Sequence, residues 1–242
     1  MAGNQTEERV NRAMIFQAWR SVAFLHWPVA PEVVASRLPD GLEPDTVEGS
    51  AWLGLTPFRV ERFGVLDLPV VPVVTSFNET NVRTYVRGPD GRDGIWFFSL
   101  DVDSLVNVGA GRMGGLPYYL SAMSVQLHDH VRYRCRRRLG GWAHHDITVD
   151  PGGPVSHDRE LADMLTGRWR AYHVVGSRLV EVPVEHEPWP LRNAELVACD
   201  ESLLVRAGFD PRGEPPLVHF AAGVDARVGP PRLTRYGPRH GV

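Results

Sequence analysis

The stretch NETNVRTYV, residues 78–86, has the valine, threonine and tyrosine content of a β-strand. Side chains alternate between the two faces of a strand, so one face of this stretch is polar and the other carries threonine and valine. The polar face consists of Glu79, Asn81, Arg83 and Tyr85. A row that holds a carboxylate, an amide, a guanidinium and a phenol is either exposed to water or lines a polar cavity.

A hairpin is predicted directly after this strand. The sequence RGPDGRDG separates it from IWFFSLDVD, and a Pro-Asp-Gly turn between two such runs is typical of a β-hairpin. A register with Tyr85 opposite Phe97 would place Arg83 opposite Ser99. If the polar row faces water, we expect an ion pair between Arg83 and Asp101. The pattern alone favours this solvent-exposed interpretation.

The rest of the chain predicts a mostly antiparallel β domain of the α+β class with a few peripheral helices, for which a closed barrel is one arrangement. Further strands are predicted at 17–29, 51–60, 118–127, 131–139, 145–150, 170–175 and 178–186. Helical segments are predicted at 31–38, 104–113 and 192–209, and a proline- and valine-rich link at 66–74. The last helix rests on the spacing of Leu196, Val197, Leu203 and Leu204 and on a stop near Gly208.

No internal repeat or linker divides the chain, so we predict one domain over residues 17–228. Residues 1–16 are polar and are expected to be disordered. Residues 229–242 lack core-forming side chains and are expected to form a loose tail.

Composition excludes several classes of protein. A net charge of −3 and a pI near 6.4 give no support to a nucleic-acid partner, and no apolar run approaches the length of a membrane span. The basic run at 132–138 alternates with Val131, Tyr133 and Cys135, which is typical of a strand with one solvated face. The only other cysteine is Cys199, so a reducing cytoplasm is expected.

Cofactor and metal signatures are missing from the sequence: no GxGxxG follows a strand, and there is no Walker loop, GxSxG elbow or HExxH. We therefore expect no cofactor and no metal. All 26 basic Lys and Arg residues are arginines. No side chain of this protein can form a Schiff base with a carbonyl substrate, because that reaction requires a lysine amine.

Several other side chains are candidates for a binding site. His26 lies between aromatic residues on a strand, which favours a core position over a functional one. His186 stands between two glutamates, which would either raise its pKa for proton transfer or leave it structural at the rigid corner that follows. Of Arg168 and Arg170, at most one is expected to face a ligand.

The sequence resembles a known family over residues 17–227. The motifs FLHWPV, SFNETNVRTYV, FFSLDVDS, GRMGGLPYYLSAM, RWRAY, VEHEPWPL and LVHFAAGVDARV occur in this order and resemble the YqjF-like family of uncharacterised bacterial proteins, domain of unknown function 2071. That family is similar to acetoacetate decarboxylase, so the resemblance implies a closed, cone-like antiparallel β barrel around a buried pocket. The decarboxylase carries its nucleophilic lysine in a Gly-aromatic-Pro-Lys-Lys-Leu motif. The comparable stretch here places Tyr118 at that lysine and Tyr119 at its neighbour.

The resemblance changes the interpretation of the polar row, which we now expect to line an internal cavity. It implies a cofactor-free protein that binds or acts on a carbonyl-containing organic acid, by acid and base chemistry of a lyase or isomerase type and without the decarboxylase's covalent step. In this hypothesis Glu79, Tyr118 and His186 are catalytic. The residues expected to contact substrate are Arg83, Asn81, Tyr85, Tyr119 and His26. A non-catalytic sensor or carrier of a metabolite is the alternative, and a homo-oligomer is left open.

Overall fold

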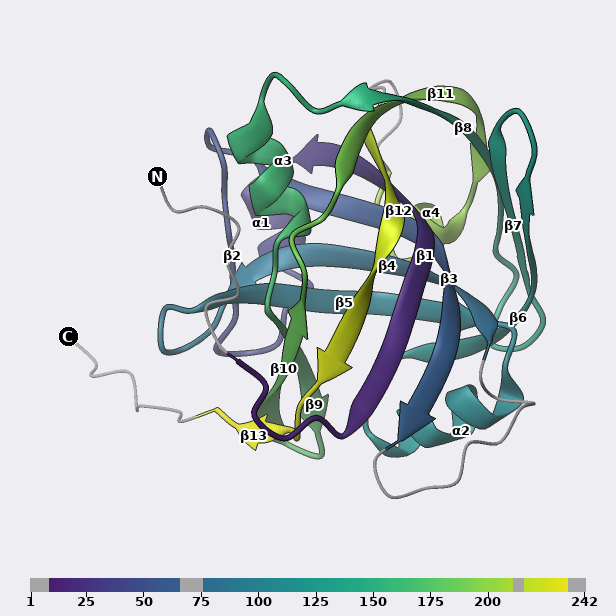
Figure 1. Ribbon diagram of the computed structural model, residues 1–242. Coiled ribbons are helices and arrows are strands. Elements are labelled where there is room, and N and C mark those ends of the chain that lie inside the picture. Colours follow the sequence, from purple (N-terminus) through teal and green to yellow (C-terminus); the bar gives the residue numbers. More distant parts are fainter. Residues whose placement is uncertain (1–8, 66–75, 211–215, 235–242) are drawn as a thin grey trace.

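Two β-rings that share a wall form the body of the protein (Figure 1). The computed structural model describes residues 9–65, 76–210 and 216–234. The strands are β1 (Ile15–Val29), β2 (Glu43–Pro44), β3 (Ala51–Val65), β4 (Phe77–Arg87), β5 (Asp93–Val102), β6 (Tyr118–Leu127), β7 (Val131–Arg137), β8 (His144–Pro154), β9 (Arg170–Val175), β10 (Arg178–His186), β11 (Leu191–Glu201), β12 (Leu217–Val228) and β13 (Arg232–Leu233). The helices are α1 (Pro31–Ala35), α2 (Leu105–Met113), α3 (Arg159–Thr166) and α4 (Leu203–Arg206).

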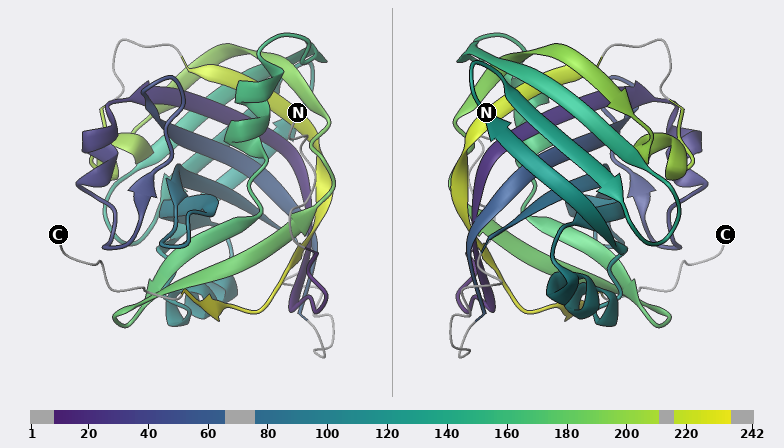
Figure 2. Two further views of the ribbon diagram at one scale, coloured as in Figure 1. Left: turned by 90° about the vertical axis from the view of Figure 1, so that its left-hand side faces the viewer. Right: turned by 90° about the vertical axis from the view of Figure 1, so that its right-hand side faces the viewer.

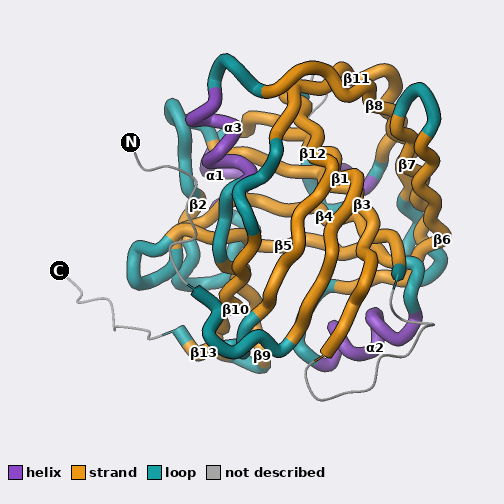
Figure 3. Tube along the Cα trace, viewed as in Figure 1, coloured by secondary structure: helices purple, strands orange, loops and turns teal. Residues whose placement is uncertain are grey.

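Hydrogen bonding closes the larger ring through β1, β3, β4, β5, β6, β7, β8, β11 and β12. The pair β9 and β10 closes a second ring, because β9 pairs with β5 and β10 pairs with β12 (Figure 2). Only the pairings of β5 with β6 and with β9 are parallel among the described strands. The predicted closed, mostly antiparallel barrel with a few helices at its edges is therefore confirmed (Figure 3).

The shared wall is buried on both faces. Along β1, Leu25 belongs to the core of the larger ring, while the neighbouring Phe24 faces the second ring. The same holds for β4, where Val82 packs in the larger core and its neighbours Asn81 and Arg83 face the second ring. Both rows of β4 are consequently removed from water, as its burial from Glu79 through Val86 shows. A strand that is buried on two faces must satisfy its polar groups inside the protein.

The predicted β4–β5 hairpin is confirmed, but its predicted register is wrong. Tyr85 lies opposite Ile95 and Arg83 opposite Phe97. The difference arises at the turn, which already pairs Arg87 with Asp93, two residues earlier than the predicted register requires; a β-bulge between Val82 and Arg83 then shifts the register again farther from the turn.

The helix predicted at 192–209 is also wrong over most of its length. Residues 191–201 form β11, which pairs with β8 through two register shifts, and only the four residues of α4 are helical. Leu203 and Leu204 of α4 are buried in the larger core. Pairing with β8 overrides the helical spacing because tertiary contacts outweigh local propensity.

The ends of the described chain contribute to the barrel. β1 begins at Ile15, the buried Val10 donates its backbone N–H to Glu185, and β13 pairs with β10. The boundaries predicted at residues 16 and 229 therefore fall inside structured segments, while the link at 66–74 lies outside the described residues. No helix within the described ranges has the length and apolar character to cross a membrane.

Candidate functional site

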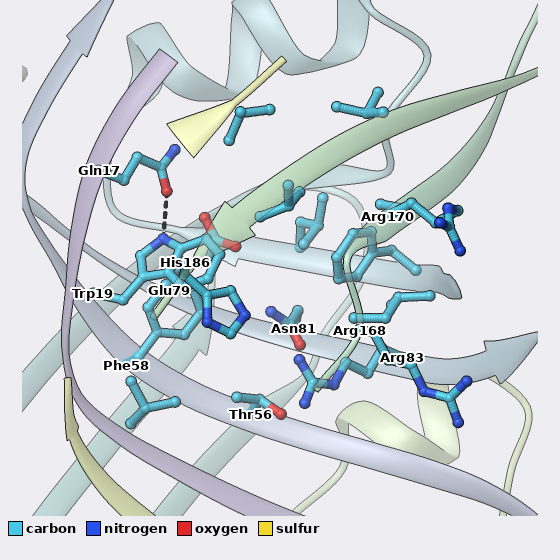
Figure 4. Close-up of a pocket in the computed structure, with 18 of the residues that line it drawn as sticks. Gln17, Trp19, Thr56, Phe58, Glu79, Asn81, Arg83, Arg168, Arg170 and His186 are labelled. Atoms are coloured by element: carbon cyan, nitrogen blue, oxygen red, sulfur yellow. Dashed lines mark hydrogen bonds between the residues drawn. The ribbon is translucent and has the colours of Figure 1, made fainter. Parts of the chain in front are cut away.

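The second ring encloses a cavity of about 200 Å³. Its walls are mostly apolar and aromatic, with side chains such as Trp19, Phe58 and Trp189. The ionisable and amide groups that line it are Gln17, Glu79, Asn81, Arg83, Tyr118, Arg168, Arg170, His173 and His186, of which Figure 4 labels all but Tyr118 and His173. Three residues of the polar row, Glu79, Asn81 and Arg83, thus line a cavity and Tyr85 is buried behind it, so the solvent-exposed interpretation is wrong.

Polar groups in the cavity gather at two ends. Figure 4 shows Glu79 and His186 beside Trp19 at one end, Asn81 near the middle, and the arginines at the other end. Glu79 and Arg83 are four residues apart on β4, which corresponds to roughly 13 Å between their Cα atoms. The strand itself therefore separates an acid from a cation along one wall.

Arg83 is the unusual cation of the site. Its residue exposure is 7%, yet within the described residues it forms no ion pair. Its Nε donates to the Tyr85 hydroxyl at 3.3 Å, its Nη2 reaches the Leu165 carbonyl at 3.5 Å, and its Cζ lies over the rings of Phe24 and Tyr85. Long hydrogen bonds and ring faces compensate a buried guanidinium poorly, since a buried charge ordinarily requires a counter-charge.

Arg168 and Arg170 both line the cavity, so the prediction that only one would face a ligand is wrong. Residues two apart on an extended chain point to the same side, so alternation places Arg168 and Arg170 together and only Trp169 between them faces away. Arg168 Nη1 contacts Asp45 at 2.6 Å and Asp93 at 2.7 Å, and Arg170 Nη1 contacts Asp93 at 3.0 Å. The sequence analysis missed Asp45 and Asp93, whose only signal was their position in turns far from the arginines they bind.

Glu79 is poised to hold a proton. Burial raises its pKa to about 8, Asp101 adds to that rise, and a side-chain hydrogen bond from Asn81 opposes it. Burial also raises the pKa of the nearby Tyr118 hydroxyl well above its ordinary value, and the Glu79 charge raises it further. At neutral pH both groups are therefore proton donors inside an apolar enclosure.

His186 differs from its prediction. Burial lowers its pKa to about 4, a backbone hydrogen bond at Glu187 opposes this, and Arg83 lowers it further. Neighbours on a strand point to opposite faces, so the side chain of Glu185 does not flank it and instead accepts from the backbone of Val10. His186 Nδ1 lies 2.6 Å from the Glu187 carbonyl oxygen and must donate to it, which makes Nε2 the unprotonated nitrogen of the neutral ring.

His26 and Tyr85 lie behind the cavity wall. Their side chains share a hydrogen bond of 2.5 Å, and the Tyr85 hydroxyl in turn accepts from Arg83. Burial, with the charges of Arg83 and His219, lowers the pKa of His26 well below its usual value. Neither residue lines the cavity, although both were predicted to contact a ligand. Tyr85 holds the Arg83 side chain directly, and His26 acts on it through the hydrogen bond to Tyr85.

Tyr119 is the predicted site residue that the structure places elsewhere. It follows Tyr118 on β6 and therefore points to the opposite face. Its ring packs on Arg137, with 3.7 Å from the guanidinium carbon to the ring centre. Trp19, Gln17 and Thr56 line the cavity and were missed, because nothing in their local sequence distinguishes them from core residues.

Comparison with known proteins shows the family of the chain. Residues 16–225 match the family described as "Uncharacterized conserved protein", domain of unknown function 2071. The chain is 33% identical over 220 residues to the uncharacterized protein YqjF of Bacillus subtilis (strain 168), covering 89% of this chain and 90% of that protein.

Solved structures with the same fold have low sequence identity. An acetoacetate decarboxylase-like enzyme from Sphingomonas wittichii RW1 matches with a TM-score of 0.67 and 14% identity, covering 95% of this chain and 96% of that one. The enduracididine biosynthesis enzyme MppR, complexed with pyruvate, matches with a TM-score of 0.63 and 17% identity, covering 94% and 93%. The chain therefore belongs to the YqjF-like family, domain of unknown function 2071, and has the acetoacetate decarboxylase-like barrel that its sequence implied.

Proposed function

We propose that the cavity binds a small organic acid that carries a carbonyl group, with its carboxylate on Arg83. The observation that carries this proposal is the buried guanidinium of Arg83, which lacks a carboxylate partner within the described residues. Arg168 and Arg170, in contrast, are held by Asp45 and Asp93. A ligand carboxylate would supply the missing counter-charge and accept two parallel N–H bonds.

Charge balance in the cavity also favours an anion. With a pKa of about 8, Glu79 is protonated at neutral pH and does not offset the charge of Arg83. Arg83 thus brings an uncompensated positive charge into a poorly solvated space. A keto acid restores neutrality there, and MppR, which shares the fold, has been solved with pyruvate.

The other groups suit proton transfer at the carbonyl. Protonated Glu79 would donate to the carbonyl oxygen, and the Tyr118 hydroxyl would stabilise the developing oxyanion. The unprotonated Nε2 of His186 would accept a proton from the neighbouring carbon. No covalent intermediate is needed. The carbon loses the proton that His186 gains, and the carbonyl oxygen receives the proton that Glu79 releases. This is enolisation, the step that lyase and isomerase reactions of keto acids share.

Binding is tested by calorimetry and thermal denaturation with pyruvate and other 2-oxo and 3-oxo acids. At a ligand concentration of 100 Kd the wild type should gain about 2.7 kcal/mol of stability. Arg83→Gln should lose this gain, whereas Arg136→Gln, a control on the exposed face of β7, should retain it. An equal gain in wild type and Arg83→Gln, or no binding of any acid to the wild type, would refute the proposal.

Solvent-deuterium exchange separates an enzyme from a carrier. If the cavity enolises its ligand, the protons next to the carbonyl of a bound 2-oxo acid exchange in D₂O faster with the wild type than with Glu79→Gln. A sensor or carrier would bind the same acid through Arg83 without accelerating this exchange.

A further inference from the structure

A second, larger space adjoins the cavity at the end of the barrel near α2 and β13. We call it the vestibule; its volume is about 770 Å³. Residues that line both the vestibule and the cavity are Ile15, Gln17, Leu116, Tyr118, His173, Val182 and Val228. Because these residues line both, the two spaces lie next to each other and meet at these side chains.

The strands that line both spaces change from polar to apolar side chains as they pass from the cavity to the vestibule. β4 leads from Arg83 past Asn81 and Glu79 to Phe77, which lines the vestibule. On this strand the polar groups end where the vestibule begins.

The other side of the ring repeats this change. β9 leads from Arg170 through the shared His173 to Val175. β10 leads from His186 through the shared Val182 to Val180. β4 and the β9–β10 hairpin thus place ionisable groups at the inner end and mostly apolar side chains at the outer end.

The vestibule leaves apolar side chains open to water. Met14, Val175 and Leu233 are 42%, 44% and 58% exposed, and the charged residues that line the vestibule, Arg178 and Arg232, are exposed as well. Exposed apolar surface in a concave space is costly in water and favours an apolar ligand group that covers it.

We infer that the ligand is an amphipathic acid, whose carboxylate binds Arg83 and whose alkyl or aryl tail extends past Glu79 into the vestibule. This inference rests on the proposed function and adds the substrate class. Arg83 and Phe77 are six residues apart on β4, roughly 20 Å between Cα atoms. A three-carbon acid bound at Arg83 would leave the vestibule unfilled, whereas a longer tail would bury its apolar wall.

The test measures Kd by calorimetry for straight-chain 2-oxo acids from three to ten carbons. Each methylene that enters the vestibule should tighten binding about fourfold, which corresponds to about 0.8 kcal/mol per buried CH₂. Ala110→Trp adds bulk at an exposed position of α2 that lines the vestibule, so it should flatten this dependence and leave pyruvate binding unchanged. Val106→Trp is the matched control, because Val106 is 62% exposed on the same helix and does not line the vestibule.

The outcomes separate the two proposals. If Kd is independent of chain length while Arg83→Gln still abolishes binding, the tail site is wrong and the carboxylate site stands. The tail site is equally wrong if Ala110→Trp leaves the chain-length dependence intact. If no acid binds, or if long acids bind Arg83→Gln as well as the wild type, the carboxylate site itself is wrong and the tail proposal fails with it.

Discussion

Arg83 and Arg137 have the same residue exposure, 7%, and differ in what surrounds them. Arg137, on β7, forms a bidentate ion pair with Asp101 at 2.6 and 2.8 Å, and Ser121 donates to the same carboxylate. Arg83, on β4, has two long hydrogen bonds and no ion pair within the described residues. We therefore propose that the pair in the larger ring maintains the fold, while the cation in the second ring binds a ligand.

The largest effect is expected when the paired arginine loses its partner. Asp101→Ala leaves the Arg137 guanidinium buried without a counter-charge, so the free energy of unfolding should fall by about 3 to 5 kcal/mol. Urea denaturation followed by circular dichroism measures it. Arg83→Met is the matched comparison: it removes an uncompensated buried charge, so the unliganded protein should be as stable as the wild type or more stable. Comparable losses for both variants would contradict the distinction between the two arginines.

The next effect concerns the two carboxyl groups of this comparison. Asp101 is ion-paired, whereas Glu79 has a pKa that burial raises to about 8. Between pH 4.5 and 8 the folded state holds a proton at Glu79 that the unfolded state releases, so this residue makes stability fall as pH rises. From pH 6.5 to 8, Glu79→Gln should gain about 1.5 kcal/mol relative to the wild type.

The buried histidines contribute equally to both proteins in this window. Burial lowers the pKa of His145 and His186 to about 4, so they make stability rise with pH until the unfolded pKa of about 6.5 is well passed, and this contribution cancels in the difference between wild type and Glu79→Gln. Urea denaturation of wild type and Glu79→Gln at pH 6.5, 7.25 and 8 gives the difference directly. Parallel pH profiles would show that Glu79 is ionised in the cavity.

The sequence predicted the strands that carry Arg83 and Arg137 better than it predicted the contacts of these two arginines. Strand alternation placed Glu79, Asn81 and Arg83 on one face, and the turn sequence predicted the hairpin, because both depend on local geometry. The partner of Arg83 could not be predicted: strand pairing begins at Arg87 and Asp93, two residues earlier than the turn sequence suggested, and Asp101 binds an arginine from a strand far along the chain.

The burial of a side chain is the second property that local sequence could not predict. Two glutamates beside His186 suggested a raised pKa, but burial of the imidazole in the second ring lowers it. Burial follows from how β9 and β10 close that ring, which is a property of the whole topology. The helix predicted at 192–209 failed for the same reason, since pairing with β8 decides its conformation.

The smallest effect separates two adjacent tyrosines that belong to the two regions. Tyr118 lines the cavity beside Glu79, and Tyr119 packs on Arg137. Tyr118→Phe removes a donor to the proposed oxyanion and should slow deuterium exchange of a bound keto acid by about tenfold or more, with little change in stability. Tyr119→Phe retains the ring over Arg137 and should change neither quantity, while Tyr119→Leu should cost about 1 kcal/mol through loss of the cation–π contact. If Tyr119→Phe slowed exchange as much as Tyr118→Phe, the acid chemistry would not be confined to the second ring, and the division of the two arginines into a structural and a ligand-binding residue would fail with it.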